Sequence, residues 1–320
     1  MRVLFPPLEP VSTWCLETGG VHRVYVEDCG SRDGTPVVFL HGGPGSGCKP
    51  YHRQFFDPAR YRVILFDQRG CGRSTPAGAT AENTTADLIA DMEAIRERLG
   101  IERWVLFGGS WGATLALLYA QRHPGRVLAM ILRGTFLARR QDVDWFFRDG
   151  VSRIFPDAWE TFTAAFPAVA DGDYVAAACE EMRSGDPARR TACARAWSDW
   201  TGKVVTYLLP ESPATEPTPE QTERMRNEVS VETHYAQHRY FIEENQVLRD
   251  VPRLPRVPTV IVHGRRDLTC TLEASWTLHR ALPHSRLVIL REAGHLANEP
   301  AMIDALVSAT EQLHEALQCP

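Results

Sequence analysis

The chain has 320 residues, of which 44% are hydrophobic and 23% charged, and its formal net charge is −5. These values are typical of a globular protein with one large domain, or one domain with an insert, and they exclude a disordered or fibrous chain. No basic face or tail stands out, so we expect no nucleic-acid partner. There is no signal-peptide core and no apolar run near the ~18 residues of a membrane span. The scattered cysteines show no metal-ligand spacing, so we expect a cytoplasmic protein without a metal site.

The first part of the chain alternates segments with strand-like and helix-like patterns. The earliest segment, 22–28, alternates in polarity as an exposed strand does, and the following apolar runs are typical of buried strands. Strands are predicted at residues 22–28, 36–40, 62–66, 104–107 and 129–134. A helix is predicted over 83–99, capped by Thr84 or Thr85, and another over 113–123, ended by Pro124.

The alternation breaks off at about residue 136 and resumes near residue 258. Residues 136–250 predict helices and loops, with a Pro/Ser/Thr-rich surface loop at 210–219. Beyond them we predict strands at 258–264 and 286–290 and helices at 273–282 and 301–317. The sequence thus predicts the α/β class, with a mostly parallel sheet and helices on both faces. We expect a core of residues 1–135 and 251–320, interrupted by a helical cap of residues 136–250.

The strongest chemical motif is Gly108-Gly109-Ser110-Trp111-Gly112, which lies between a predicted strand and a predicted helix. A sharp turn at this place exposes a serine hydroxyl at the end of the sheet, while small neighbours relieve crowding between strand and helix. The positive end of the helix then lies near a developing oxyanion. The alternative is a tight turn with an incidental serine. The setting favours Ser110 as a catalytic nucleophile.

A nucleophilic serine needs a base, and the base needs an acid that orients it. In this kind of fold the acid and the histidine follow the serine in that order. Asp267 follows the strand that ends at 264, and His295 follows the next strand, so both belong at the carboxyl edge of the sheet. His279 and His284 also follow Asp267, but they lie within or just past a helix. We therefore predict Ser110, Asp267 and His295 as a catalytic triad.

The loop His41-Gly42-Gly43-Pro44-Gly45 directly follows a buried strand. Glycines allow the backbone to approach a substrate closely. We predict that the Gly43 amide and the Trp111 amide form the oxyanion hole. The alternative is a glycine- and proline-rich turn that binds nothing.

Several blocks together resemble the proline iminopeptidases. They are HGGPG (41–45), DQRGCGRS (67–74), GGSWG (108–112), AWSDW (196–200), ETHY (232–235), VHGRRD (262–267) and AGH (293–295). The resemblance extends from about residue 5 to residue 315. It implies an α/β-hydrolase serine exopeptidase with a helical cap, which removes an N-terminal residue, typically proline, from a peptide or aminoacyl amide. It implies no metal and no organic cofactor.

The resemblance also implies how the substrate amine is bound. Carboxylates of the cap bind the α-ammonium group in this family, and one of them falls on Glu232. The other falls on Thr201, where a hydroxyl cannot supply the negative charge of a carboxylate. Losing that carboxylate should weaken ammonium binding by ~1.5–3 kcal/mol. Either another carboxylate replaces it or the natural substrate differs. The candidates for such a replacement are Asp199, Glu243 and Glu244.

Further residues match the family's substrate pocket. We expect Phe136, Phe146, Cys270 and Trp111 to form an apolar slot for a ring or short side chain, although each aromatic could equally be plain core. Arg133 is expected to support the cap carboxylates. Arg69 and Arg73 are expected to support the structure rather than to contact substrate.

Two other functions remain open at this point. The first is an esterase, amidase or acyl-transfer enzyme that acts on a specialised metabolite, with a vestigial amine pocket. The second is a non-catalytic binding protein on a hydrolase fold, which the complete set of Ser110, Asp267 and His295 disfavours.

Overall fold

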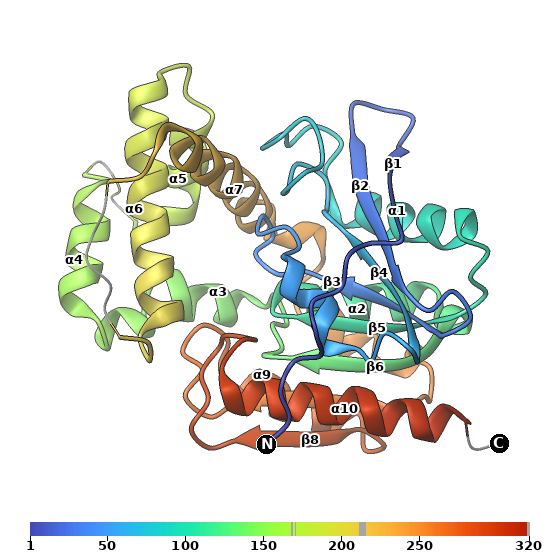
Figure 1. Cartoon of the computed structure of the whole chain (residues 1–320). Coiled ribbons are helices and arrows are strands. Elements are labelled where there is room, and N and C mark those ends of the chain that lie inside the picture. Colours follow the sequence, from blue (N-terminus) through green and yellow to red (C-terminus); the bar gives the residue numbers. More distant parts are fainter. Residues whose placement is uncertain (168, 170, 211–215, 319–320) are drawn as a thin grey trace.

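The computed structural model describes residues 1–167, 169, 171–210 and 216–318. Within them, one sheet holds the strands in the order β1-β2-β4-β3-β5-β6-β7-β8 (Figure 1). Its strands are β1 (Ser12–Glu17), β2 (Arg23–Gly30), β3 (Thr35–Leu40), β4 (Tyr61–Phe66), β5 (Trp104–Gly109), β6 (Val127–Arg133), β7 (Thr259–Gly264) and β8 (Arg286–Leu290). Strands β3 to β8 run parallel, and β2 is antiparallel to both of its neighbours. The predicted α/β class and mostly parallel sheet are confirmed.

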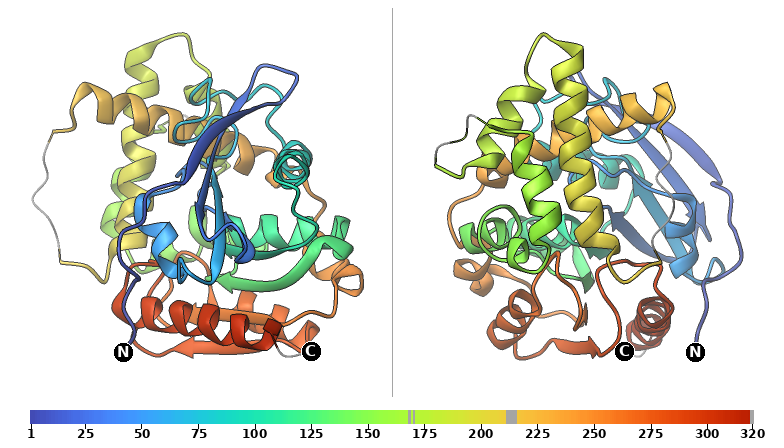
Figure 2. Two further views of the ribbon diagram at one scale, coloured as in Figure 1. Left: turned by 45° about the vertical axis from the view of Figure 1, so that its right-hand side comes forward. Right: turned by 90° about the vertical axis from the view of Figure 1, so that its left-hand side faces the viewer.

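Each central strand buries both of its faces. Val38 and Leu40 of β3 belong to one hydrophobic cluster and Val37 and Phe39 to another, because successive side chains point to opposite sides of a sheet. Helices α1 (Thr85–Arg98), α2 (Trp111–Arg122) and α9 (Leu272–Ala281) pack into the first cluster. Helix α10 (Pro300–Gln318) and the 3-10 helix η1 (Pro50–Phe55) pack into the second (Figures 1 and 2). Helices therefore cover both faces, as predicted.

Two features of the N-terminal edge differ from the prediction. Strand β1 was not predicted, because it is a half-exposed edge strand without a clear apolar pattern. It pairs with β2 along its whole length, so β2 lies inside the sheet and its Val24 and Val26 are fully buried. The expectation of an exposed strand at residues 22–28 is therefore wrong, although the strand itself is present.

Between β6 and β7 the described residues form helices, several of which stand beside the sheet on the left of Figure 1. They are α3 (Arg140–Phe147), α4 (Pro156–Ala164), α5 (Tyr174–Met182), α6 (Pro187–Thr206), α7 (Pro219–Gln237) and α8 (Gln246–Arg249). Part of the loop predicted at 210–219 lies outside the described residues. The division into a core of residues 1–135 and 251–320 and a cap of residues 136–250 stays a prediction. Within the described residues, no helix is both long and apolar enough to cross a membrane.

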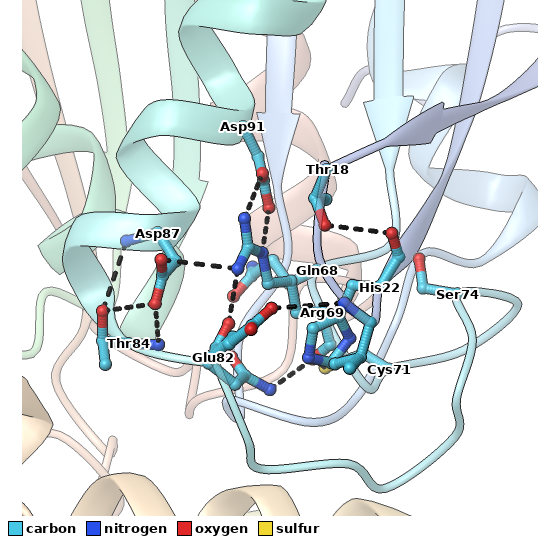
Figure 3. A network of polar contacts seen from close by, with 12 residues as sticks. Thr18, His22, Gln68, Arg69, Cys71, Ser74, Glu82, Thr84, Asp87 and Asp91 are labelled. Atoms are coloured by element: carbon cyan, nitrogen blue, oxygen red, sulfur yellow. Dashed lines mark hydrogen bonds and ion pairs between the residues drawn. The ribbon is translucent and has the colours of Figure 1, made fainter.

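Helix α7 is fixed to the core by side-chain hydrogen bonds. The Ser230 hydroxyl donates to the Gly78 carbonyl over 3.0 Å, and the Tyr235 hydroxyl donates to Asn83 Oδ1 over 2.9 Å. Asn83 in turn donates from its side-chain amide to the Arg69 carbonyl over 2.9 Å. Arg69 donates two hydrogen bonds to the carboxylate of Asp91 on α1, from Nε over 2.7 Å and from Nη2 over 2.8 Å (Figure 3). This continuous network holds α7 in a fixed position relative to the sheet.

Candidate active site

Ser110 lies at a sharp turn between β5 and α2. Its backbone has φ 56° and ψ −125°, a conformation that side chains rarely adopt. The motif's glycines are needed because a Cβ at Gly108 would lie 2.2 Å from the Gly112 carbonyl oxygen, and one at Gly112 would lie 2.0 Å from the Leu40 carbonyl oxygen. The strand and helix therefore pack closely enough to force the turn. The half-buried Ser110 side chain lines a cavity.

Asp267 and His295 come from the loops after β7 and β8 and form a buried pair. His295 Nδ1 and Asp267 Oδ2 are 2.7 Å apart. The other carboxylate oxygen accepts the Thr269 and Cys270 amides, each over 2.9 Å. Burial alone would raise the pKa of Asp267, but the charge and hydrogen bond of His295 bring this pKa below its ordinary value. Asp267 is thus an ionised, fully bonded acceptor that fixes the ring of His295.

Arg133, the last residue of β6, lies beside this pair. Its Nη1 donates to the His295 carbonyl over 2.7 Å and lies 3.3 Å from His295 Nε2. The expectation that Arg133 supports the cap carboxylates is therefore wrong. The two parallel strands β5 and β6 pair Gly109 with Arg133, which brings the guanidinium to the catalytic edge of the sheet.

The Ser110 hydroxyl lies 3.7 Å from the Cys270 thiol. The hydrogen bonds among the described residues do not include one between Ser110 and His295. Attack by the serine therefore requires its hydroxyl to turn toward Nε2, and such bonds commonly tighten only when substrate is bound. The Cys270 thiol is buried, which raises its pKa well above the ordinary value and keeps it protonated.

The oxyanion loop, residues 41–45, passes directly over the serine. A Cβ at Gly42 would lie 3.3 Å from the Ser110 Cβ, and Gly43 has φ +109° with its backbone open to the cavity. Trp111 is the first residue of α2, where amides have no acceptor within the helix. The Gly43 and Trp111 amides thus belong to segments that lie next to Ser110, and their role as an oxyanion hole stays a prediction.

The Trp111 side chain lies behind this site. It is fully buried, it lies outside the cavity lining, and its indole donates to Gln68 Oε1 over 2.9 Å. Gln68 donates to the His41 carbonyl over 2.9 Å, so the indole connects the oxyanion loop to the turn at Ser110. The expectation that Trp111 forms part of the apolar slot is wrong.

The cavity beside Ser110 has a volume of about 490 Å³ and lies between the sheet edge and helices α3, α6 and α7. Its lining includes the predicted Phe136, Phe146, Cys270, Thr201 and Glu232. These residues come from distant parts of the sequence, and the structure brings them together around the serine.

Glu232 is a carboxyl group that lines the cavity from helix α7. Its Oε2 accepts the Trp197 indole N–H over 2.7 Å. Burial raises the pKa of Glu232 to about 8; the Trp197 hydrogen bond lowers it and the Glu228 charge raises it further. A carboxyl with such a pKa is poised to pair with a cation that enters the cavity.

The carboxylates expected to replace the missing charge at Thr201 lie elsewhere. Asp199 is exposed on α6, outside the cavity lining. Glu243 pairs with Arg249 on the surface, and the exposed Glu244 accepts the Arg140 amide over 3.1 Å. These expectations are wrong.

Two residues at the site were missed from the sequence. Glu228 lines the cavity one helical turn before Glu232, and the four-residue spacing was a usable signal. Gly134 has φ +51°, and a Cβ there would lie 3.1 Å from Asp267 Oδ2 and 3.3 Å from His295 Nδ1. Gly134 therefore makes room for the acid–histidine pair, which no sequence pattern indicated.

Comparison with known proteins agrees with this geometry. Residues 35–301 match the alpha/beta hydrolase fold family. A solved alpha/beta fold family hydrolase from Bacillus anthracis superimposes with a TM-score of 0.61 at 21% identity, over 94% of this chain and 99% of that one. The class of the protein is therefore that of the α/β hydrolases.

The family within that class follows from closer relatives. The proline iminopeptidase of Xylella fastidiosa is 47% identical over 97% of this chain and 99% of its own length. That of Arabidopsis thaliana is 43% identical over 98% of this chain and 82% of its own. The chain belongs to the proline iminopeptidase family of α/β hydrolases.

Proposed function

We propose that this chain is a serine exopeptidase that releases an N-terminal proline, or another small aminoacyl group, from a short peptide or aminoacyl amide. The observation that supports this most directly is the carboxyl of Glu232, which lines the same cavity as Ser110. A carboxylate and a nucleophile in the same cavity suit a substrate with a free α-amine next to its scissile carbonyl.

The proposed reaction passes through an acyl-enzyme. Ser110 Oγ bonds to the substrate carbonyl carbon while its proton passes to His295 Nε2, and Asp267 keeps the imidazole oriented. The Gly43 and Trp111 amides donate to the resulting oxyanion. When the carbon–nitrogen bond breaks, His295 returns the proton to the leaving amine. Water then repeats the sequence on the ester and frees the aminoacyl group.

The substrate-binding roles divide between charge and shape. Glu232 binds the ammonium group, while Phe136, Phe146 and Cys270 enclose the ring or short side chain. Thr201 adds a small polar surface without charge. Arg133 is proposed to position His295 through its carbonyl rather than to bind substrate.

A substrate panel tests this function. Purified enzyme is compared on a prolyl amide, the same amide with an acetylated nitrogen, and a plain acyl ester, with Ser110→Ala as the control for contaminating activity. We expect rapid hydrolysis of the free-amine substrate, at least 100-fold slower hydrolysis of the acetylated one, and none by Ser110→Ala. Equal rates on the free and acetylated amides would instead support the esterase, amidase or acyl-transfer alternative.

We also propose that the enzyme acts in the cytoplasm on small peptides. The support is chemical: the cysteines within the described residues are free thiols, which a reducing compartment preserves. Fractionation of the native host, followed by the prolyl amide assay on each fraction, tests this location.

A further inference from the structure

Helix α7 presents two glutamates to the cavity. Glu228 and Glu232 are four residues apart, so their side chains leave the same face of the helix. Both lie among the residues that line the cavity with Ser110. The cavity therefore has a pair of carboxylates on one helix. Only Glu232 belongs to a family motif, the ETHY block at 232–235.

This face of α7 packs closely against the oxyanion loop. A Cβ at Gly45 would lie 2.9 Å from the Glu228 carbonyl oxygen and 3.3 Å from the Glu232 Cγ. Only a glycine allows this approach, and its φ of +136° agrees with that requirement. Because Ser230 and Tyr235 tie the same helix to the core, both carboxylates are fixed relative to the reacting centre.

The facing helix α6 contributes no such charge. Thr201 lines the cavity, but its hydroxyl donates to the Ser198 carbonyl of its own helix over 3.3 Å. Trp197 on the same helix already holds one oxygen of Glu232. A substrate ammonium at Glu232 therefore finds its second anionic neighbour on α7, at Glu228, rather than on α6.

We propose that Glu228 and Glu232 together form the ammonium-binding site, with Glu228 as a specificity-determining residue that replaces a carboxylate on α6. This inference rests on the proposed function and specifies its substrate class. A secondary ammonium such as that of N-terminal proline has two N–H donors, and each carboxylate accepts one of them. The pair thus suits an N-terminal imino acid.

The charges around the pair support a division of labour. Glu228 is the outer member, because its side chain is 34% exposed and lies 3.8 Å from the exposed Arg224. Lys49 at the cavity edge also faces Glu228. Ion pairs that are exposed to solvent stabilise a carboxylate only weakly. A substrate ammonium can therefore replace Arg224 and Lys49 at Glu228.

The inner carboxyl faces groups that carry no positive charge. Trp197 from α6 donates a hydrogen bond, and the buried Cys71 and Tyr240 both have raised pKa values that keep them protonated. Glu228 is the charged neighbour of Glu232 on α7 itself. Next to Glu232 an incoming ammonium therefore meets a second acid, Glu228, and none of these neighbours of Glu232 carries a positive charge.

The test moves the charge from one helix to the other. KM and kcat for a prolyl amide are measured for wild type, Glu228→Gln, Thr201→Glu and the double variant. Glu223→Gln is the matched control, because Glu223 is an exposed carboxylate on the same helix that does not line the cavity. Thermal unfolding confirms that each variant is folded.

We expect Glu228→Gln to raise KM about tenfold with kcat changed less than threefold, since it removes binding outside the reacting atoms. Thr201→Glu in that background should return KM to within about threefold of wild type. A merely structural role for Glu228 would not be rescued by a carboxylate on the opposite helix. The control should match wild type.

The outcomes separate this inference from the proposed function. If Glu228→Gln has the KM of wild type, or loses activity that Thr201→Glu does not restore, the carboxylate pair is refuted while a free-amine requirement leaves the exopeptidase intact. If wild type hydrolyses the acetylated amide as fast as the free one, the exopeptidase function itself is refuted.

Discussion

Replacing Trp197 with phenylalanine should shift the acid limb of the pH–activity profile. The indole N–H that binds Glu232 over 2.7 Å is lost, while an aromatic ring still stacks on Phe147. A hydrogen bond to a charged group stabilises by about 1.5–3 kcal/mol, and a pKa unit corresponds to about 1.4 kcal/mol. The pKa of Glu232 should therefore rise from about 8 by a further one to two units.

The assay is kcat/KM for a prolyl amide between pH 6 and 8, where ionised Glu232 limits ammonium binding. Because the ionised fraction falls as its pKa rises, the Trp197→Phe curve should lie about 10- to 100-fold below wild type at pH 6, and about half as far below it at pH 8. The control is Trp200→Phe, which removes an equally buried indole on the same helix that donates to the Phe146 carbonyl over 3.2 Å. If the Trp197→Phe curve overlies that of the folded control, Glu232 does not govern binding and the reasoning fails.

Three further changes have defined outcomes. Ser110→Ala should lower kcat at least 10⁴-fold, as measured by steady-state turnover. Circular dichroism should show that the fold is intact. Gly134→Ala should lower kcat about 10- to 100-fold by displacing His295, whereas the exposed Gly125→Ala should be silent because a Cβ there meets nothing within 4 Å. Glu232→Gln should make the free energy of unfolding less dependent on pH. A carboxyl whose pKa is about 8 in the folded state and near 4.5 in the unfolded state destabilises the fold progressively as the pH rises above 4.5. Between pH 7 and 9 the free energy of unfolding of wild type, measured in urea, should therefore fall by ~1 kcal/mol more than that of the variant.

The catalytic residues could be predicted because they follow from strand order. Ser110 directly follows a strand, Asp267 and His295 lie in the loops that follow two others, and parallel strands bring their carboxyl ends to one edge. Arg133 ends a strand at that same edge, but its partner could not be predicted. Its contact with His295 depends on the pairing of β6 with β5 and on the rotamer of a long side chain.

The cavity residues between β6 and β7 are harder to predict, because they meet across helices rather than at strand ends. The sequence suggests Asp199 on α6, or Glu243 and Glu244, as replacements for the charge missing at Thr201. The structure places Glu228 at the cavity instead, because α7 packs on the oxyanion loop at Gly45. Nothing in the sequence specifies which face of α7 meets that loop. The edge strand β1 escaped prediction for a related reason, since its half-exposed residues depend on β2 for their pairing.

The raised pKa of Glu232 has a consequence for selectivity. In the empty cavity at neutral pH the inner carboxyl is mostly protonated, since its pKa is about 8. An ammonium ion that binds there displaces this proton, so the cavity exchanges one positive charge for another and avoids an unpaired buried anion. A neutral ester gains nothing from that exchange. Discrimination in favour of free amines therefore weakens as the pH falls below 8.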